Sequence, residues 1–315
     1  MPPTKKSVKH ESKKWPLGVS IFEVGPRDGL QSEAKILTLE QRQKLIVLLM
    51  EAGLSDIEVG SFVRDDRIPQ LAGSGKLMKS LEEKRKSWKG RFWAFVPNEV
   101  GLNHAVEAGV DGASFFTATS NTFCQKNVNR SKKELLDALG PLLKTTKKLK
   151  KKSRVYISTL TYCPYEGPIK PSVVTDLVST LVQCGASELV LSDTTGDANP
   201  RSLARVFEPL LKKYSPSLFA LHFHDTRGLG LVNIMEGMKF GIVRFDSSVG
   251  GMGGCPYAPG ASGNLATEDL VNLLKGLGLL PGINLGLVAK AGAYAQQVLA
   301  NRLPSRVLRT LENAQ

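Results

Sequence analysis

The sequence lacks the marks of a secreted or membrane protein. Its four cysteines, Cys124, Cys163, Cys184 and Cys255, form no CxxC pair and no disulfide-like spacing. Free cysteines without a framework indicate a reducing compartment, so we expect a cytoplasmic protein. No apolar run approaches the ~18 residues of a transmembrane helix, and we therefore expect no membrane partner. The remaining composition, 42% hydrophobic and 23% charged, is typical of a globular protein with a large core.

Acidic residues are in deficit, and 42 Lys and Arg against 29 Asp and Glu give a formal charge of +13. Such an excess can indicate a nucleic-acid partner. Much of it lies in two places, the first fourteen residues and the run Lys144–Arg154. The first fifteen residues also lack the apolar stretch of a secretory signal. We interpret residues 1–16 as a disordered basic tail and the run as a solvated helix end, so we expect no nucleic-acid partner.

Short apolar runs alternate with segments of helical spacing along the rest of the chain. Eight such runs are expected to be strands: Val19–Val24, Asp56–Val59, Phe92–Val96, Gly112–Phe116, Val155–Leu160, Glu188–Ser192, Leu218–Phe223 and Val243–Val249. Thr38–Met50 begins with a capping residue and continues with a periodic apolar face, and Pro171–Cys184 and Pro200–Lys213 follow the same pattern. Gly53, Gly109 and Gly185 are expected to end helices.

Eight strands alternating with helices predict an α/β fold, a (β/α)₈ TIM barrel. The alternative, a doubly wound sheet, predicts a Gly-rich dinucleotide loop after the first strand. The sequence there is Gly25–Gly29, GPRDG, which is not that motif. We expect residues 17–315 to form a single catalytic domain. Its helical segment from about residue 265 would pack outside the barrel as extra C-terminal helices.

Unusual polar residues stand at the carboxyl ends of the expected strands. They are Arg27 and Asp28 after the first strand, Glu58 and Ser61 at the second, Asp193 at the sixth, and His222 and His224 at the seventh. In a barrel these ends converge on one face, where active sites are built. The sequence therefore predicts that residues far apart in the chain meet at one mouth.

His222 and His224 are two of only four histidines. Side chains two apart on a strand point the same way, so both imidazoles would face the mouth. They are either two satisfied buried histidines or two ligands of a divalent metal, with Asp28 as the third ligand. Glu58 would point inward and needs a partner, for which Arg27 is the candidate. That pair could be structural, catalytic or both.

The segment from Gly250 to Asn264 is rich in glycine and follows the eighth expected strand. It could be a surface turn or a mobile lid over the catalytic face. Cys255 lies inside it, and a cysteine in an exposed loop is a candidate for a chemical role. The other three cysteines are expected to be structural.

Together these residues give the chain a family resemblance. It resembles the 3-hydroxy-3-methylglutaryl-CoA lyases, members of a group of metal-dependent lyases and synthases built on (β/α)₈ barrels. The resemblance covers roughly residues 17–300. The stretches that carry it are Glu23–Gln31, Ile57–Val63, Cys163–Gly167, Ser192–Gly196, His222–Thr226, Asp246–Ala258 and Gly260–Leu270. The Arg-Asp-Gly and His-x-His motifs mark the wider group, whereas the Gly-Gly-Cys-Pro-Tyr-Ala loop is specific to the lyases.

The resemblance implies a metal-dependent retro-Claisen cleavage of 3-hydroxy-3-methylglutaryl-CoA to acetyl-CoA and acetoacetate. It implies that Asp28, His222, His224 and Asn264 bind Mg²⁺ or Mn²⁺. Arg27 would stabilise an enolate, oriented by Glu58, and Cys255 would protonate the product carbanion. Asp28 or His222 would be the general base. We expect the substrate-binding residues to be Arg27, Gln31, Ser61, Lys126, Asn127 and Asp193.

Two alternatives remain open. The chain departs from the family pattern at Gly60, Arg227 and Leu229, so the substrate could be a longer 3-hydroxyglutaryl-CoA derivative. A Claisen-type synthase of the same group is the other, although such enzymes typically carry a C-terminal regulatory domain of ~100–150 residues, for which we expect no room after Asn264. Leucine degradation and ketone body formation are the implied pathways, and a homodimer is a possible assembly.

Overall fold

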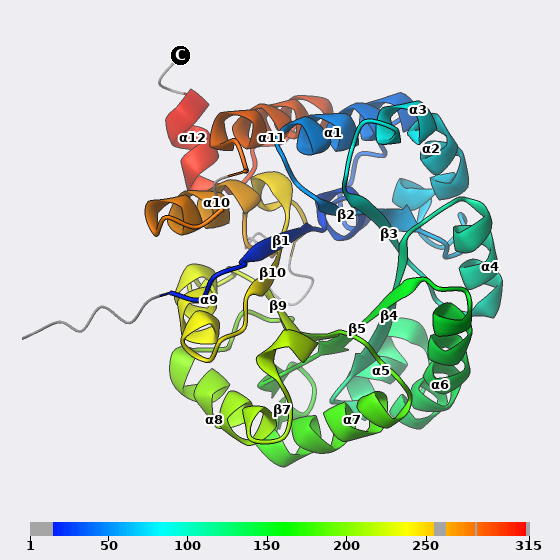
Figure 1. Cartoon of the computed structure of the whole chain (residues 1–315), viewed down its shortest axis with the longest axis vertical. Coiled ribbons are helices and arrows are strands. Elements are labelled where there is room, and N and C mark those ends of the chain that lie inside the picture. Colours follow the sequence, from blue (N-terminus) through cyan, green and yellow to red (C-terminus); the bar gives the residue numbers. More distant parts are fainter. Residues whose placement is uncertain (1–14, 255–262, 281, 313–315) are drawn as a thin grey trace, which may run out of the picture.

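Eight parallel strands close into a barrel in the computed structural model, which describes residues 15–254, 263–280 and 282–312. Their spatial order is β1-β10-β9-β8-β5-β4-β3-β2, and the helices form a ring around them (Figure 1). The strands are β1 Ser20–Glu23, β2 Asp56–Ser61, β3 Arg91–Phe95, β4 Gly112–Ala118, β5 Lys152–Ser158, β8 Leu189–Asp193, β9 Phe219–Phe223 and β10 Arg244–Ser247. The predicted TIM barrel is confirmed, and all eight expected strands are present with bounds shifted by a few residues.

The helices occupy the segments between the strands. They are α1 Leu39–Glu51, α2 Ser74–Ser80, α3 Glu82–Arg85, α4 Glu99–Glu107, α5 Asn121–Val128, α6 Lys132–Lys148, α7 Pro171–Gln183, α8 Pro200–Leu211, α9 Gly230–Lys239, α10 Thr267–Gly276, α11 Leu285–Leu299 and α12 Arg306–Glu312. Short helical turns are η1 Gly25–Gly29, η2 Pro69–Leu71, η3 Pro216–Leu218 and η4 Val249–Gly251. A small hairpin that the sequence did not predict, β6 Tyr162–Cys163 with β7 Gly167–Pro168, follows β5.

Local sequence explains where the elements begin and end. Thr38 and Gln41 form a reciprocal capping box at the start of α1. Gly53, Gly109 and Gly185 have positive φ angles of 95°, 83° and 92° after their helices. This left-handed conformation suits glycine and turns the chain back toward the next strand, as predicted.

The C-terminal helices lie outside the barrel, beside the first helix of the ring (Figure 1). Helix α11 packs on α1, where the Lys44 ammonium lies 4.5 Å from the centre of the Tyr294 ring. In the described part of the chain no helix is long and apolar enough to cross a membrane. The start of the fold differs from our expectation, because Trp15 packs against the core although residues 1–16 were predicted to be a disordered tail. Residues 1–14 lie outside the described residues.

The main core lies between the strands and the helices, while polar and aromatic side chains fill the barrel. Strand β5 shows the division, because Val155 and Ile157 join the outer core and Tyr156 packs inside with Val190 and Ala220. Arg154, on the same face as Tyr156, is 0% exposed. The prediction that Lys144–Arg154 is wholly a solvated helix end is therefore wrong at Arg154, because the strand begins at Lys152 and alternation turns this side chain inward.

Candidate active site

Arg27 and Asp28 lie in a single π-helical turn, η1, directly after β1. The amides of Asp28 and Gly29 both donate to the carbonyl of Val24, at 2.7 and 3.2 Å, which widens the turn. Such turns are rare and often occur at functional sites. Nη1 of Arg27 donates to Oδ1 of Asp28 at 2.6 Å. The turn therefore holds a guanidinium and a carboxylate next to one another at the barrel mouth.

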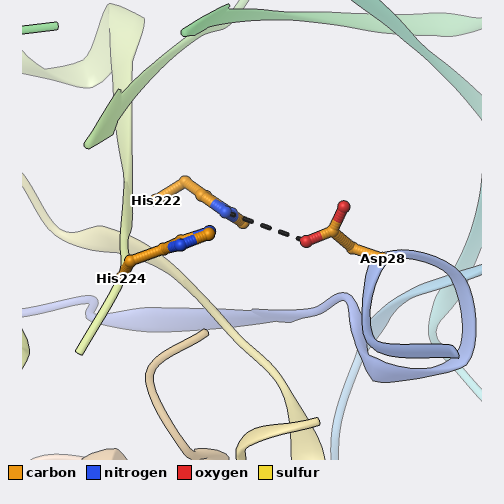
Figure 2. A group of neighbouring side chains, drawn as sticks. All are labelled: Asp28, His222 and His224. Carbon is orange, nitrogen blue, oxygen red and sulfur yellow. Dashed lines mark ion pairs between the residues drawn. The ribbon is translucent and has the colours of Figure 1, made fainter. Parts of the chain in front are cut away.

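The two histidines come from β9 and the residue that follows it. His222 and His224 are both buried, and their ring centres are 5.5 Å apart. Figure 2 shows both rings directed toward Asp28 across the mouth. Nε2 of His222 lies 3.9 Å from Oδ2 of Asp28. One ligand atom from each of the three residues lies within 4.8 Å of the other two.

Asn264, the last residue of the glycine-rich stretch, joins this group. Its backbone pairs with His224 in an isolated β-bridge. Its amide nitrogen Nδ2 donates to Oδ2 of Asp28 at 2.9 Å and to the carbonyl of Met252 at 3.1 Å. Because the nitrogen is satisfied by these acceptors, the amide oxygen is the atom that can bind a cation. Gly253 has a φ of 98°, and a Cβ there would lie 2.6 Å from Nδ2 of Asn264, so glycine is required beside this amide.

The electrostatics of the group suit a divalent cation. Burial raises the pKa of the Asp28 carboxyl, but the opposing charge of Arg27, with His222 and Asn264, lowers it overall to about 2, so the carboxylate is an anion. Burial, with His222 beside it, lowers the pKa of His224 to about 3, so its imidazole is neutral. Nδ1 of His224 is buried without a hydrogen-bond partner among the described residues. A neutral imidazole with an unsatisfied nitrogen beside a carboxylate fits a metal site.

A second group, next to the first, surrounds the guanidinium of Arg27. Nε of Arg27 donates to Oε2 of Glu58 at 2.5 Å, which confirms the predicted partner. The Tyr156 hydroxyl donates to the same oxygen at 3.4 Å, and the guanidinium carbon lies 5.4 Å from the Tyr156 ring centre. Burial lowers the pKa of Arg27, but Glu58 and Asp28 raise it overall, so Arg27 is a fixed cation.

The other predicted site residues lie around this centre. Ser61 is the last residue of β2, and its hydroxyl accepts from the amide of Val63 at 3.2 Å. Asp193 ends β8, and its carboxylate accepts from the amides of Asp197 and Ala198. Burial raises the pKa of Asp193 to about 6. Gln31 follows η1, Lys126 and Asn127 lie on α5, and all three are exposed. Cys255 lies outside the described residues.

Our reading of the sequence missed three residues inside the barrel, Arg154, Tyr156 and Asp246. Asp246 lies opposite His222 in the β10–β9 register, with Oδ2 at 3.3 Å from Nδ1 of His222. The alternation of side chains along a strand could have predicted that these residues point into the barrel. Tyr156 stands between Val155 and Ile157, and Asp246 follows Phe245, which faces the outer core.

Two further buried carboxyls, Glu23 and Glu268, anchor the stretch after β10. Oε1 of Glu23 accepts from the amides of Gly25 and Val249, at 2.7 and 2.9 Å. Both oxygens of Glu268 accept from the amide of Gly250, at 3.0 and 2.8 Å. Burial raises the pKa of Glu23 to about 7 and that of Glu268 to about 8. These groups connect η1 at the site to the start of the glycine-rich stretch.

Sequence comparisons place this chain among known enzymes. The HMGL-like family model matches residues 18–294. The human protein "3-hydroxy-3-methylglutaryl-CoA lyase, cytoplasmic" is 41% identical over 94% of this chain and 79% of its own length. The mitochondrial hydroxymethylglutaryl-CoA lyase of Macaca fascicularis is 40% identical over 93% of this chain and 89% of its own length.

Solved structures agree with these comparisons. Hydroxymethylglutaryl-CoA lyase from Pseudomonas aeruginosa superposes with a TM-score of 0.92 at 37% identity, over 96% of this chain and 100% of that one. An HMG-CoA lyase from Acinetobacter baumannii, solved with coenzyme A and 3-methylmalate, gives a TM-score of 0.84 at 33% identity, over 92% and 94% of the two chains.

Proposed function

This chain belongs to the HMGL-like family, and from that membership we propose that it is a carbon–carbon lyase for 3-hydroxy-3-methylglutaryl-CoA. The products are acetyl-CoA and acetoacetate. The observation that carries this function is the joint placement of Asp28, His222 and His224 at the barrel mouth, beside Arg27. Relatives that match almost the whole chain bear the name of this enzyme.

Asp28, His222, His224 and the amide oxygen of Asn264 would hold a divalent metal, which we propose to be Mg²⁺ or Mn²⁺. Mixed oxygen and nitrogen ligands suit these ions. When bound, the cation supplies positive charge that lowers the pKa of the substrate's C3 hydroxyl. The ligands come from η1, β9 and the segment before α10, so closure of the barrel is what assembles them.

The chain's residues then divide the reaction between them. Asp28 accepts the C3 hydroxyl proton, or His222 does so while its Nε2 does not bind the cation. The bond between C2 and C3 then breaks, and C3 becomes the ketone of acetoacetate. The electron pair moves onto the thioester carbonyl as an enolate, which Arg27 stabilises by charge. Glu58 holds Arg27 in place. Cys255 returns a proton to C2, which completes acetyl-CoA.

Substrate binding is assigned to residues around the same mouth. Ser61 and Asp193 end strands β2 and β8 next to the centre, and Gln31 comes shortly after η1. Lys126 and Asn127 on α5 are exposed and available to the CoA moiety. The exposed ammonium of Lys126 suits the CoA phosphates. The A. baumannii relative, solved with coenzyme A, supports an acyl-CoA substrate.

The biological setting follows from the same proposal. The chain from Trp15 onward would act as a single catalytic domain, in the cytoplasm and as a homodimer, in leucine degradation and ketone body formation. The cysteine pattern supports the location, and the relatives include cytoplasmic and mitochondrial enzymes.

The decisive experiment offers the purified chain 3-hydroxy-3-methylglutaryl-CoA with EDTA, Mg²⁺ or Mn²⁺ and measures acetoacetate. We expect product only when a metal is added. Absence of product with every metal would refute the function. Parallel assays with a longer 3-hydroxyglutaryl-CoA derivative compare kcat/KM. A higher kcat/KM for the longer derivative would make that compound the preferred substrate. Net condensation of acetyl-CoA would favour a synthase.

A further inference from the structure

One side of His222 is held by a carboxylate that the reaction described above does not use. Nδ1 of His222 lies 3.3 Å from Oδ2 of Asp246, and both residues are buried. They face each other across the β10–β9 pair. The opposite nitrogen of the ring, Nε2, is the one that faces Asp28. The imidazole thus lies between two carboxylates, with Asp246 at hydrogen-bond distance from Nδ1 and Asp28 further off, 3.9 Å from Nε2.

Asp246 is in turn held by a hydrogen bond from Arg154. Nη2 of Arg154 donates to Oδ1 of Asp246 at 2.8 Å, and Nε lies 2.9 Å from Oε1 of Glu188. The guanidinium carbon lies 3.5 Å from the centre of the Phe22 ring. The guanidinium is thus held by a hydrogen bond to Asp246, an ion pair with Glu188 and an aromatic face. Asp246 therefore presents its second oxygen to His222 as a charged acceptor with little freedom to turn away.

We propose that Asp246, held by Arg154, is a positioning residue that keeps the proton of His222 on Nδ1 and leaves the lone pair of Nε2 directed at Asp28. The physical reason is that a carboxylate can only accept a hydrogen bond, so the nitrogen facing it must carry the proton. A histidine held this way is fixed in tautomer and orientation, and its other nitrogen becomes a better ligand or base.

The surroundings make this arrangement specific to His222. The Tyr156 ring, from β5, lies edge-on to the imidazole with ring centres 5.8 Å apart. Asp28 from η1 and His224, which directly follows β9, are the other titratable neighbours. His224 has no carboxylate of its own at Nδ1, which is without a hydrogen-bond partner in the described chain. The two histidines are therefore inequivalent, and only His222 has its proton assigned by the protein.

This inference deepens the proposed function, because the lone pair on Nε2 is what a metal or a substrate hydroxyl would use. A test in unmodified protein is possible because the chain has only four histidines. The full-length chain, labelled with ¹⁵N-histidine and stripped of metal, is examined by NMR at a pH where imidazole is neutral. The His222 signals are identified by their loss in His222→Ala. We expect the proton on Nδ1, and a proton on Nε2 would overturn the proposal.

The substitution Asp246→Asn tests the consequence. An amide can donate to Nδ1 and would move the proton to Nε2. We expect the affinity for Mn²⁺, titrated alone and followed by the EPR signal of the free ion, to fall ~10–100-fold. The matched control is Asp56→Asn, because Asp56 is also a buried barrel aspartate paired with an arginine, Arg91, but is not paired with a histidine. Its Mn²⁺ affinity should be unchanged.

Equal losses in the two variants, or no loss in Asp246→Asn, would overturn the proposal, because either result would leave Asp246 with only a structural role. If Asp246→Asn fails to fold, the tautomer in the unmodified chain decides the question alone. Neither measurement needs substrate. A chain that forms no acetoacetate would refute the proposed function and leave this inference to be judged on the tautomer and on Mn²⁺ binding.

Discussion

The side chains of Arg27 and Glu58 form a buried ion pair across the β1–β2 junction, with Nε 2.5 Å from Oε2. Both groups are withdrawn from solvent, and the pair lies beside the carboxylate of Asp28. An arginine held in this way cannot turn toward bulk water, so its charge is already oriented before a substrate arrives. Such preorganisation is what makes a fixed cation effective at a developing negative charge.

Replacing Arg27 by Met should therefore reduce kcat far more than it changes KM. Removal of one group that stabilises a developing oxyanion typically costs ~10²–10³ in rate. Steady-state kinetics with 3-hydroxy-3-methylglutaryl-CoA measures both constants. The control is Arg64→Met, which removes an exposed arginine from a surface pair with Asp66 and should leave both unchanged. A rise in KM with normal kcat would contradict the assigned role.

Glu58→Gln keeps the shape of the side chain but removes one of the two carboxylates that pair with the buried guanidinium of Arg27, leaving Asp28 as the other. Breaking a buried ion pair from one side costs ~3–5 kcal/mol, so the urea midpoint should fall together with kcat. Asp111→Asn breaks the partly exposed pair with Arg85 and should lower stability less, without affecting kcat. A Glu58→Gln enzyme with full activity would show that the pair is only structural.

His224→Ala should abolish metal retention, because it removes a neutral, buried imidazole nitrogen. The loss should exceed the ~10–100-fold that removal of an outer hydrogen-bond partner costs. Calorimetric titration with Mn²⁺ checks this. His104→Ala, on the exposed face of α4, is the control and should bind normally. Full occupancy in His224→Ala would refute the ligand assignment.

Cys255→Ala should lower turnover strongly while the affinity for Mn²⁺ stays normal, since the proposed role of this thiol is to protonate the product carbon. Exchange of C2 hydrogens of acetyl-CoA with ²H₂O should slow in parallel. The partly buried Cys184 on the outer side of the barrel provides the control, Cys184→Ala. Unchanged turnover in Cys255→Ala would remove it from the chemistry.

Glu268 gives stability a definite pH dependence. Burial raises its pKa from 4.5 to about 8, so the folded state holds a proton that the unfolded state releases. The resulting contribution to the free energy of unfolding is complete below about pH 4.5 and is lost as the pH rises toward 8. The free energy of unfolding falls by at most about 5 kcal/mol across this range. Urea unfolding of Glu268→Gln should show a flatter decline across that range, whereas the exposed variant Glu83→Gln should follow the parent. A parallel decline in Glu268→Gln would be the contrary result.

The barrel was predictable because its signals are local. Apolar alternation, capping residues such as Thr38 and glycines after helices each reflect short-range physics, and eight repeats of them leave few folds to choose from. The convergence of Asp28, His222 and His224 followed from barrel closure alone. Asn264 was assigned only by resemblance, since nothing in its local sequence indicates that its amide turns toward Asp28.

Other features depend on contacts across the barrel that composition does not reveal. Arg154 belongs to a run of lysines and was read as solvated, yet the first residues of β5 turn it inward to Asp246 and Glu188. The wide turn at η1 depends on where the Val24 carbonyl is directed, which no residue pattern specifies. Asp193 was predicted to bind substrate. The structure shows its carboxylate accepting hydrogen bonds from the amides of Asp197 and Ala198 in the following turn, a contact that the sequence did not indicate.

The amide of Asn264 has a thermodynamic consequence. The side-chain amide nitrogen donates to Asp28 and to the Met252 carbonyl, and the Asn264 backbone pairs with His224. The residues proposed to bind the cation therefore share hydrogen bonds with the two ends of the glycine-rich stretch, at Met252 and Asn264. Thermodynamic linkage is reciprocal. If the ordered ends of the glycine-rich stretch increase the affinity for the ion, binding of the ion must stabilise these ends by the same free energy. Protection of the Asn264 backbone amide, which donates to the Gly253 carbonyl, from hydrogen exchange should therefore rise with metal concentration. Excess metal should also partly restore the stability that is lost when a mutation loosens the ends of the glycine-rich stretch.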